Sequence, residues 1–269
     1  MATVEWTGAT DNNMATATNY VRGAAPVNGD SFIAKVLPTN PVQIGNSVNL
    51  VTFTVTDAYG ANPIGTLSAG LALGTVTTFT IGARCPYVNL APGNVTTANL
   101  QMPNGCDVYL NGSATWTTTI VSSGLNVYYG ASATFTTVYS TSVAGSHNFA
   151  TGSATTTFKG PATLNTNRTI TTCTLEPGSI GTFMTAAAST TLNAVGAIVK
   201  HQSSGTLATV NLSSRALLTP LGNVSGTAAC TTVNVWSDSS YVLAVPGATL
   251  TGTFVPIGAT GLSTVGVPS

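Results

Sequence analysis

Charge is scarce in this sequence. It holds seven basic and seven acidic residues among 269, and its formal net charge is zero. Soluble domains are typically about one quarter charged, so this surface lacks the usual repulsion between neighbouring molecules. We therefore expect a subunit of an assembly. The composition also offers no basic patch for phosphate groups, so neither nucleic acid nor an acidic membrane surface is expected as a partner.

Long apolar runs are missing too. No stretch reaches the roughly 18 consecutive apolar residues of a membrane-spanning helix, so we expect no membrane segment. The first residues, Met1 to Trp6, contain neither the basic nor the apolar region of a Sec-type signal, and none is expected in this stretch.

The residues that bind metals or act as nucleophiles are few. There are four cysteines, at positions 85, 106, 173 and 230, with no C-x-x-C pair, and only two histidines. Such a set is poor material for a zinc site, and no G-x-S-x-G nucleophile motif occurs. We expect no metal, no cofactor and four buried, reduced thiols.

Carboxylates offer the remaining route to an enzyme. Glycan cleavage needs two acids that converge on one groove, and no two acids beyond the first thirty residues are close in sequence. His147 and His201 are interpreted as polar loop residues, the first in a turn and the second after a strand. We predict a protein that is not an enzyme, with glycan cleavage as an open alternative because distant acids can meet in space. The acids are Glu5, Asp11, Asp30, Asp57, Asp107, Glu176 and Asp238.

Threonine is abundant, with 49 residues. Its side chain is β-branched and favours strands. Alternating or β-branched runs, separated by Gly, Asn, Pro and Ser turns, predict an all-β chain. In segment 183–199 an alanine cluster leaves a helix as an alternative, although the Thr and Gly content there favours strand. The predicted strands cover 48–55, 75–81, 114–121, 133–138, 154–158, 169–175, 208–212, 231–236 and 248–254.

The threonine content favours one architecture among all-β folds. In a parallel stack the same side-chain position recurs about every 4.8 Å, so small or β-branched residues can form ladders in which charged residues would repel one another. We therefore predict a right-handed parallel β-helix, a solenoid, with a β-sandwich or jelly roll as the alternative. Cys85 and Cys106 lie 21 positions apart. If that spacing is one circuit, the two thiols are a candidate disulfide.

A solenoid must cover its open ends, where backbone groups and the apolar core would otherwise be exposed. Trp6 and Tyr20 are predicted to cover the core at the N-terminal end, while residues 11–13 and 28–30 make turns through side-chain to backbone hydrogen bonds. The predicted organisation is a cap at 1–45, a β-helix body at 46–245, and a C-terminal strand with an uncharged arm at 246–269.

The start of the chain also contains a motif. Its order W-T-G, D-N-N, N-Y, A-P-V-N-G-D-S-F-I resembles the N-terminal pattern W-x-G, D-x-x-W, N-W, V-P-x-x-G-D-x-V-x-I of a set of phage and bacterial surface proteins, in which a parallel β-helix follows. The resemblance covers residues 3–45. Met14 and Tyr20 stand where the pattern has tryptophan. The residues that agree are Trp6, Gly8, Asp11, Asn19, Pro26, Gly29, Asp30 and Ile33.

The resemblance implies a structural role, because many members of the set are virion proteins of tailed phages and others are secreted adhesins. We expect a capsid decoration, cement or head-fibre subunit that binds the major capsid protein or another virion protein, located in the virion. A tail fibre or tailspike component and an extracellular bacterial adhesin or filament subunit are the alternatives. A homo-oligomer is expected on the same ground, with a trimer favoured.

Several aromatic residues are candidates for contact with a partner or a glycan. They are Tyr128, Tyr129, Trp236 and Tyr241, and Trp116 is a further one. Tyrosine and tryptophan are enriched at interfaces because they combine apolar area with a polar group. Burial in the core is the alternative, especially for the two tryptophans.

Overall fold

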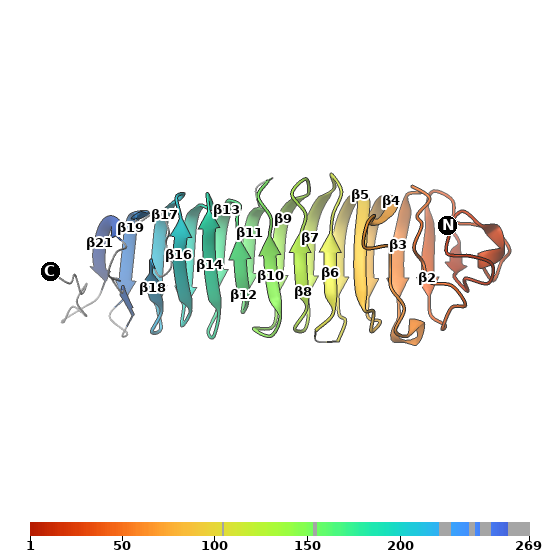
Figure 1. Cartoon of the computed structure of the whole chain (residues 1–269), viewed down its shortest axis with the longest axis horizontal. Helices are drawn as coiled ribbons and strands as arrows, with labels where there is room; N and C mark the ends of the chain where they lie inside the picture. The colour runs from red at the N-terminus through yellow and green to blue at the C-terminus, as the bar shows by residue number, and fades with distance from the viewer. Residues whose placement is uncertain (104, 153–154, 221–226, 237–239, 243–248, 258–269) are drawn as a thin grey trace. The chain divides into compact units, whose positions relative to one another are not determined.

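The computed structural model describes the chain except residues 104, 153–154, 221–226, 237–239, 243–248 and 258–269 and the side chain of Tyr241. The chain divides into two compact units, Met1–Tyr139 and Ser140–Ser269, and most of their strands are labelled in Figure 1. Each unit is a parallel β-solenoid. The described residues contain no α-helix, only strands and two single-turn 3₁₀ helices, η1 (Ala17–Asn19) and η2 (Asp57–Tyr59).

The first unit begins with one strand per turn and ends with two. The first five strands pair in parallel in chain order. The long β5 serves two neighbours, because its start pairs with β6 and its end with β7. β8 then pairs with β6, and β9 with β7. These strands are β1 (Thr3–Glu5), β2 (Asp30–Ala34), β3 (Leu50–Val55), β4 (Leu71–Ile81), β5 (Tyr87–Leu100), β6 (Asp107–Leu110), β7 (Thr115–Val121), β8 (Asn126–Tyr129) and β9 (Thr134–Ser140).

Aromatic rings run through the core of the first unit. Phe32, Phe53 and Phe79 occupy the same register position on β2, β3 and β4. Their ring centroids are 4.5 Å and 5.0 Å apart, close to the spacing of neighbouring strands. Trp116 continues the series at 6.1 Å from Phe79, and Phe135 follows at 5.9 Å. All five are fully buried. The parallel register aligns the three phenylalanines, whereas Trp116 is in register with Val95 and reaches the series from a neighbouring position.

The second unit has two strands in every turn. Even-numbered strands pair in parallel with even-numbered ones, from β10 to β20. Odd-numbered strands do the same from β11 to β21. The strands are β10 (Ser146–Phe149), β11 (Thr155–Gly160), β12 (Thr163–Thr166), β13 (Ile170–Leu175), β14 (Ile180–Thr185), β15 (Ser189–Val195), β16 (Ile198–Ser203), β17 (Thr206–Ser213), β18 (Leu217–Thr219), β19 (Thr227–Trp236), β20 (Tyr241–Val242) and β21 (Thr249–Ile257).

Pairs of threonines mark a bend that recurs in these strands. A regular strand alternates buried and exposed side chains, but here two consecutive threonines face outward between buried neighbours. Two outward residues in succession bend the strand, as a β-bulge does. The pairs are 77–78, 96–97, 117–118 and 136–137 in the first unit and 156–157, 171–172, 190–191 and 231–232 in the second. The threonine pair is therefore part of a structural repeat that recurs in most turns, although β17 has Ala208 and Thr209 in the equivalent place.

The second threonine of each pair forms an in-register ladder. In the first unit Ser31 aligns with Thr52, and that threonine begins a ladder through residues 78, 97 and 118. In the second unit the ladder runs through threonines 157, 172, 191, 209, 232 and 253. The expectation that parallel stacking produces threonine ladders is confirmed.

The prediction of an all-β parallel solenoid is confirmed, and the sandwich alternative is wrong because the strands pair in parallel turn upon turn. All nine predicted strands are present, within a few residues of the expected limits. The helical alternative for 183–199 is wrong, since this segment contributes to β14, β15 and β16. The division into cap, body and arm stays a prediction, and residues 258–269 of the predicted arm lie outside the described residues.

Candidate functional site

The N-terminal cap has an aromatic centre. Trp6 is fully buried and meets Tyr20 edge to face at a centroid distance of 5.3 Å. Phe32 of β2 lies against both rings. Each polar group has a partner: Trp6 Nε1 donates to the carbonyl of Asn40 at 3.1 Å, and the Tyr20 hydroxyl donates to the carbonyl of Met14 at 2.8 Å. Burial raises the pKa of Tyr20 well above its ordinary value, which keeps this hydroxyl a donor.

Asn19 holds the cap loops together. The side chain is completely buried. Its Oδ1 accepts hydrogen bonds from the backbone N–H groups of Thr10 and Asp11, at 2.8 and 3.0 Å. Its Nδ2 donates to Asp11 Oδ1 at 2.6 Å and to the carbonyl of Asn13 at 2.9 Å. An amide side chain has two donor hydrogens and two acceptor sites, and here all four are used.

Asp11 completes the same loop. Its Oδ1 also accepts from the backbone N–H of Asn13, and its Oδ2 accepts from the Thr16 hydroxyl. The bonds from Asn13 and Asn19 lower the pKa of Asp11 below its ordinary value, because they favour the charged form. The carboxylate therefore acts as a structural acceptor.

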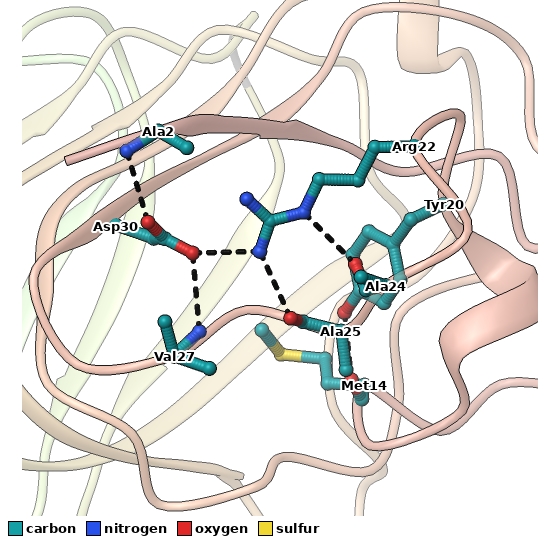
Figure 2. Close-up of polar contacts among 8 residues, drawn as sticks. All are labelled: Ala2, Met14, Tyr20, Arg22, Ala24, Ala25, Val27 and Asp30. Atoms are coloured by element: carbon teal, nitrogen blue, oxygen red, sulfur yellow. Dashed lines mark hydrogen bonds and ion pairs between the residues drawn. The ribbon is translucent and has the colours of Figure 1, made fainter.

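Figure 2 shows how Asp30 ties the first residues to the loop before β2. Its Oδ1 accepts from the backbone N–H of Ala2 at 2.9 Å. Its Oδ2 accepts from the backbone N–H of Val27 at 3.2 Å and from Arg22 at 2.7 Å. Burial alone would raise the pKa of Asp30, but the bonds from Ala2, Val27 and Arg22 outweigh it and lower the pKa.

Two glycines and a proline shape the cap. Gly8 has φ of +61°, and a Cβ there would lie 2.1 Å from the carbonyl oxygen of Asn40. Gly29 has φ of +88° but open space around it. Pro26 is buried in the loop that leads to Asp30. The glycines occupy a backbone region that L-residues avoid, which explains the G in W-x-G and in G-D.

The residues that carry the sequence resemblance are therefore structural parts of one cap. The N-terminal strands are bonded to the solenoid sheet through the pairing of β1 with β2, and Trp6 N–H donates to the carbonyl of Ile33. Met14 replaces a tryptophan of the pattern and is fully buried. Sequence reasoning missed Asn40, whose backbone and side chain bind Trp6 and Gly8. Its only sequence signal is the Asn-Pro turn that follows.

The outer surface of the solenoid is arranged in amide ladders beside the threonines. In the second unit Asn211 Nδ2 donates to Asn193 Oδ1 at 2.8 Å, and Asn234 Nδ2 donates to Asn211 Oδ1 at 2.7 Å. In the first unit Asn111 donates to Asn89, and Asn126 donates to Asp107. These bonds join neighbouring turns, and all but the one to the Asp107 carboxylate link two uncharged amides.

Tyr128, a predicted contact residue, is exposed on β8 with 36% of its surface accessible. Its ring stacks on Tyr109 of β6 at a centroid distance of 4.8 Å, because the two occupy the same register position. Tyr109 was missed by sequence reasoning, although its 19-residue spacing from Tyr128 is one turn. Tyr87 is partly exposed on the adjoining β5. Three of the outward-facing tyrosines in the described chain thus share the face formed by β5, β6 and β8.

The other predicted contact residues differ in their exposure. Tyr129 is only 1% exposed and meets Phe135 edge to face at 4.8 Å. The prediction of Tyr129 as a contact residue is wrong. Side chains alternate along a strand, so the residue next to the exposed Tyr128 points into the core. Trp116 is likewise in the core, whereas Trp236 is 37% exposed. The Tyr241 side chain lies outside the described residues.

All four cysteines are buried, free thiols in the structure. Cys85 and Cys106 lie in the segments that precede β5 and β6, which are paired strands. Burial, with a smaller contribution from Cys106, raises the pKa of Cys85 to about 12. A thiol with such a pKa is unreactive at neutral pH. The disulfide between Cys85 and Cys106 is not formed here and stays a prediction for oxidising conditions.

Both histidines are core residues. His147 lies in β10 and His201 in β16, and both are buried. The interpretation of these residues as loop residues is wrong, because each occupies an inward position of a short strand that the sequence pattern did not reveal. His147 Nε2 lies 3.1 Å from the Ser140 hydroxyl, and His201 Nε2 donates to the carbonyl of Ala229 at 2.9 Å. Burial lowers the pKa of His147 to about 4 and also lowers that of His201.

The acids occupy separate places. Glu5 pairs with Lys35 at 3.0 Å, and Asp11 and Asp30 belong to the cap. Asp57 begins η2, Asp107 lies on β6, Glu176 lies between β13 and β14, and Asp238 falls outside the described residues. No group of three or more metal-binding side chains occurs in the described part of the chain. Among the same residues, no helix has the length and apolar character needed to span a membrane.

Comparison of the chain with protein-family models, curated protein sequences and solved structures finds no significant match to any of them.

Proposed function

We propose that this chain is a non-enzymatic structural protein of a bacteriophage virion, a capsid decoration, cement or head-fibre subunit of the surface-protein set that its N-terminal motif resembles. It docks on the major capsid protein or another virion protein through apolar and hydroxyl surface. The observation that carries the proposal is the cap. The motif residues Trp6, Asn19 and Asp30, and Tyr20 at a position where the motif has tryptophan, are buried and make their hydrogen bonds inside the cap.

The surface chemistry supports a subunit that is incorporated into a larger assembly. Two ion pairs of the described chain, Arg22 with Asp30 and Lys35 with Glu5, lie in the cap. The solenoid surface carries threonine and asparagine ladders, which offer hydroxyl and amide groups at a regular spacing. A surface of this kind suits a partner that is itself repetitive, such as a capsid lattice.

The contact residues in this proposal are Tyr109 and Tyr128 of the first unit and Trp236 of the second. Their exposed edges combine apolar area with a hydrogen-bonding group, as interface aromatic residues commonly do. The phenolic hydroxyls of Tyr109 and Tyr128 have no hydrogen-bond partner within the described residues and so remain available to a docking protein.

The test is the composition of purified particles. DNA-filled particles isolated on a density gradient should contain this chain in a fixed ratio to the major capsid protein, as measured by quantitative mass spectrometry. Tyr128→Ala should lower that ratio, whereas Tyr139→Ala, which alters a tyrosine 42% exposed on β9, should leave it unchanged. Absence of the chain from particles, or a ratio that varies between preparations, contradicts the proposal.

A further inference from the structure

The solenoid units differ in how their first and last strands are covered. In the first unit the cap covers the N-terminal strands, with Trp6 and Tyr20 buried beneath its loops. In the second unit the last strand of the odd-numbered sheet, β21, is bonded along one edge to β19. Within the described residues β21 has no hydrogen-bonded neighbour on its other edge. A row of backbone N–H and C=O groups in that position is a template for another strand.

The chemistry of β21 lacks the usual protection of an edge. Its nine residues, T-L-T-G-T-F-V-P-I, include no charged side chain. Thr251 and Thr253 are exposed, and Phe254 is only half-buried. Natural proteins commonly place lysine on such edges to prevent pairing. Two features of β21 disfavour pairing. Pro256 near its end has no N–H to donate, and Gly252, with φ of +155°, lies where the register with β19 is irregular.

We propose that β21 is the docking edge for a second copy of this chain, which adds its own β21 as an antiparallel strand about a two-fold axis near Thr253. A two-fold contact brings the same patch of both copies together. It sets Thr253 opposite its own copy and Thr251 opposite Val255, so a charge near the centre of the strand would lie close to the same charge of the second copy and repel it. An edge with no charge over nine residues meets that requirement. The pairing does not depend on the virion role and belongs to the isolated chain.

The experiment is sedimentation equilibrium on the purified full-length chain. The expected mass is twice the 27.0 kDa of one chain, and a threefold mass, as the trimer implied by the sequence resemblance would give, would contradict the proposal. The double variant Thr251→Lys/Thr253→Lys should sediment as a monomer, because lysines would face lysines across the axis. Both side chains are exposed, so the variant should keep its fold, and far-UV circular dichroism checks this.

A matched control uses the same substitutions elsewhere. Thr171 and Thr190 are exposed threonines on β13 and β15, away from the edge strand. The variant Thr171→Lys/Thr190→Lys should remain a dimer. Hydrogen exchange should show the β21 amides protected in the dimer and exchanging faster in the Thr251→Lys/Thr253→Lys variant.

Three other results would also overturn the proposal. They are a wild-type chain that is monomeric at all concentrations, a β21 lysine variant that still dimerises, and a control variant that loses the dimer equally. If the chain's own residues 258–269 cover the edge, the wild type is a monomer and a chain ending at Ile257 associates, which also contradicts the inference.

Discussion

The side-chain amide of Asn211 donates a 2.8 Å hydrogen bond to Asn193 one turn earlier, and its oxygen accepts a 2.7 Å bond from Asn234 one turn later. A single side chain thus links three turns of the second unit. Because hydrogen bonds of this kind repeat between equivalent positions, the stability of a solenoid depends on its neighbouring turns.

Removing the middle of this ladder should cost more than removing its end. Asn211→Ala loses two side-chain bonds and should lower the free energy of unfolding by about 2 kcal/mol, whereas Asn234→Ala loses one and should cost about 1 kcal/mol. Urea unfolding followed by circular dichroism measures both. Equal costs for the two variants would show that the amide bonds do not set the difference.

The two cap glycines should respond differently to alanine. Gly8→Ala combines a positive φ with a Cβ 2.1 Å from the Asn40 carbonyl, so it should lower the free energy of unfolding by about 3 kcal/mol or more. Gly29→Ala meets only the positive φ, with open space around it, and should cost about 1 kcal/mol. Thermal and urea unfolding of the two variants provide the comparison. A Gly8→Ala variant as stable as Gly29→Ala would contradict the described packing of the cap.

The sequence predicted five of the six odd-numbered strands of the second unit, all but β15, and none of the even-numbered ones as a separate strand. β11, β13 and β19 carry Thr-rich runs of six or more residues. β10, β12 and β18 have only three or four residues, too few to show an alternating pattern. Their strand conformation comes from parallel pairing with the turns before and after, which a local pattern does not contain. The same gap explains why His147 on β10 was misplaced, whereas His201 lies on the six-residue β16, whose parallel pairing was not visible in the sequence.

Charge within a threonine ladder should be unfavourable. Thr191 and Thr209 occupy the same register position on β15 and β17. Thr191→Glu/Thr209→Glu should lose about 0.5 to 1 kcal/mol more free energy of unfolding than the two single variants lose together. Thr191→Glu/Thr209→Lys should lose less than its two single variants together, by a similar amount. A double-mutant cycle at low salt measures this coupling. Additive effects in both cycles would show that charge repulsion within the ladders does not explain the scarcity of charged residues.

Acid should destabilise the second unit through its buried histidine. His147 has a pKa of about 4 in the folded chain, below its ordinary 6.5, because burial disfavours the charged form. The unfolded state then binds more protons between these values, so stability is retained above about pH 6.5 and lost as the pH falls toward 4, by at most about 3 kcal/mol. His147→Gln should flatten this slope in urea unfolding from pH 7 to pH 4. A variant with an unchanged slope would show that His147 is not the group responsible.

The cap could be located from the sequence but its internal bonds could not. Trp6, Asp11 and Asp30 were identified as cap residues from their types and spacing, and the structure places all three there. The role of Asn19 as a four-bond centre depends on loops that meet only in the folded chain. In the same way, the exposed Tyr128 and the buried Tyr129 differ only in the side of the strand they face, which needed the register to be known.

The most direct test of the proposed function is a salt wash of purified particles. Docking through hydroxyl and apolar surface should depend little on ionic strength, whereas charged contacts are screened within a few ångströms at about 1 M salt. After a wash in about 1 M sodium chloride, the amount of this chain per capsid should equal that of particles kept in low salt. Release of the chain by the wash would contradict the account.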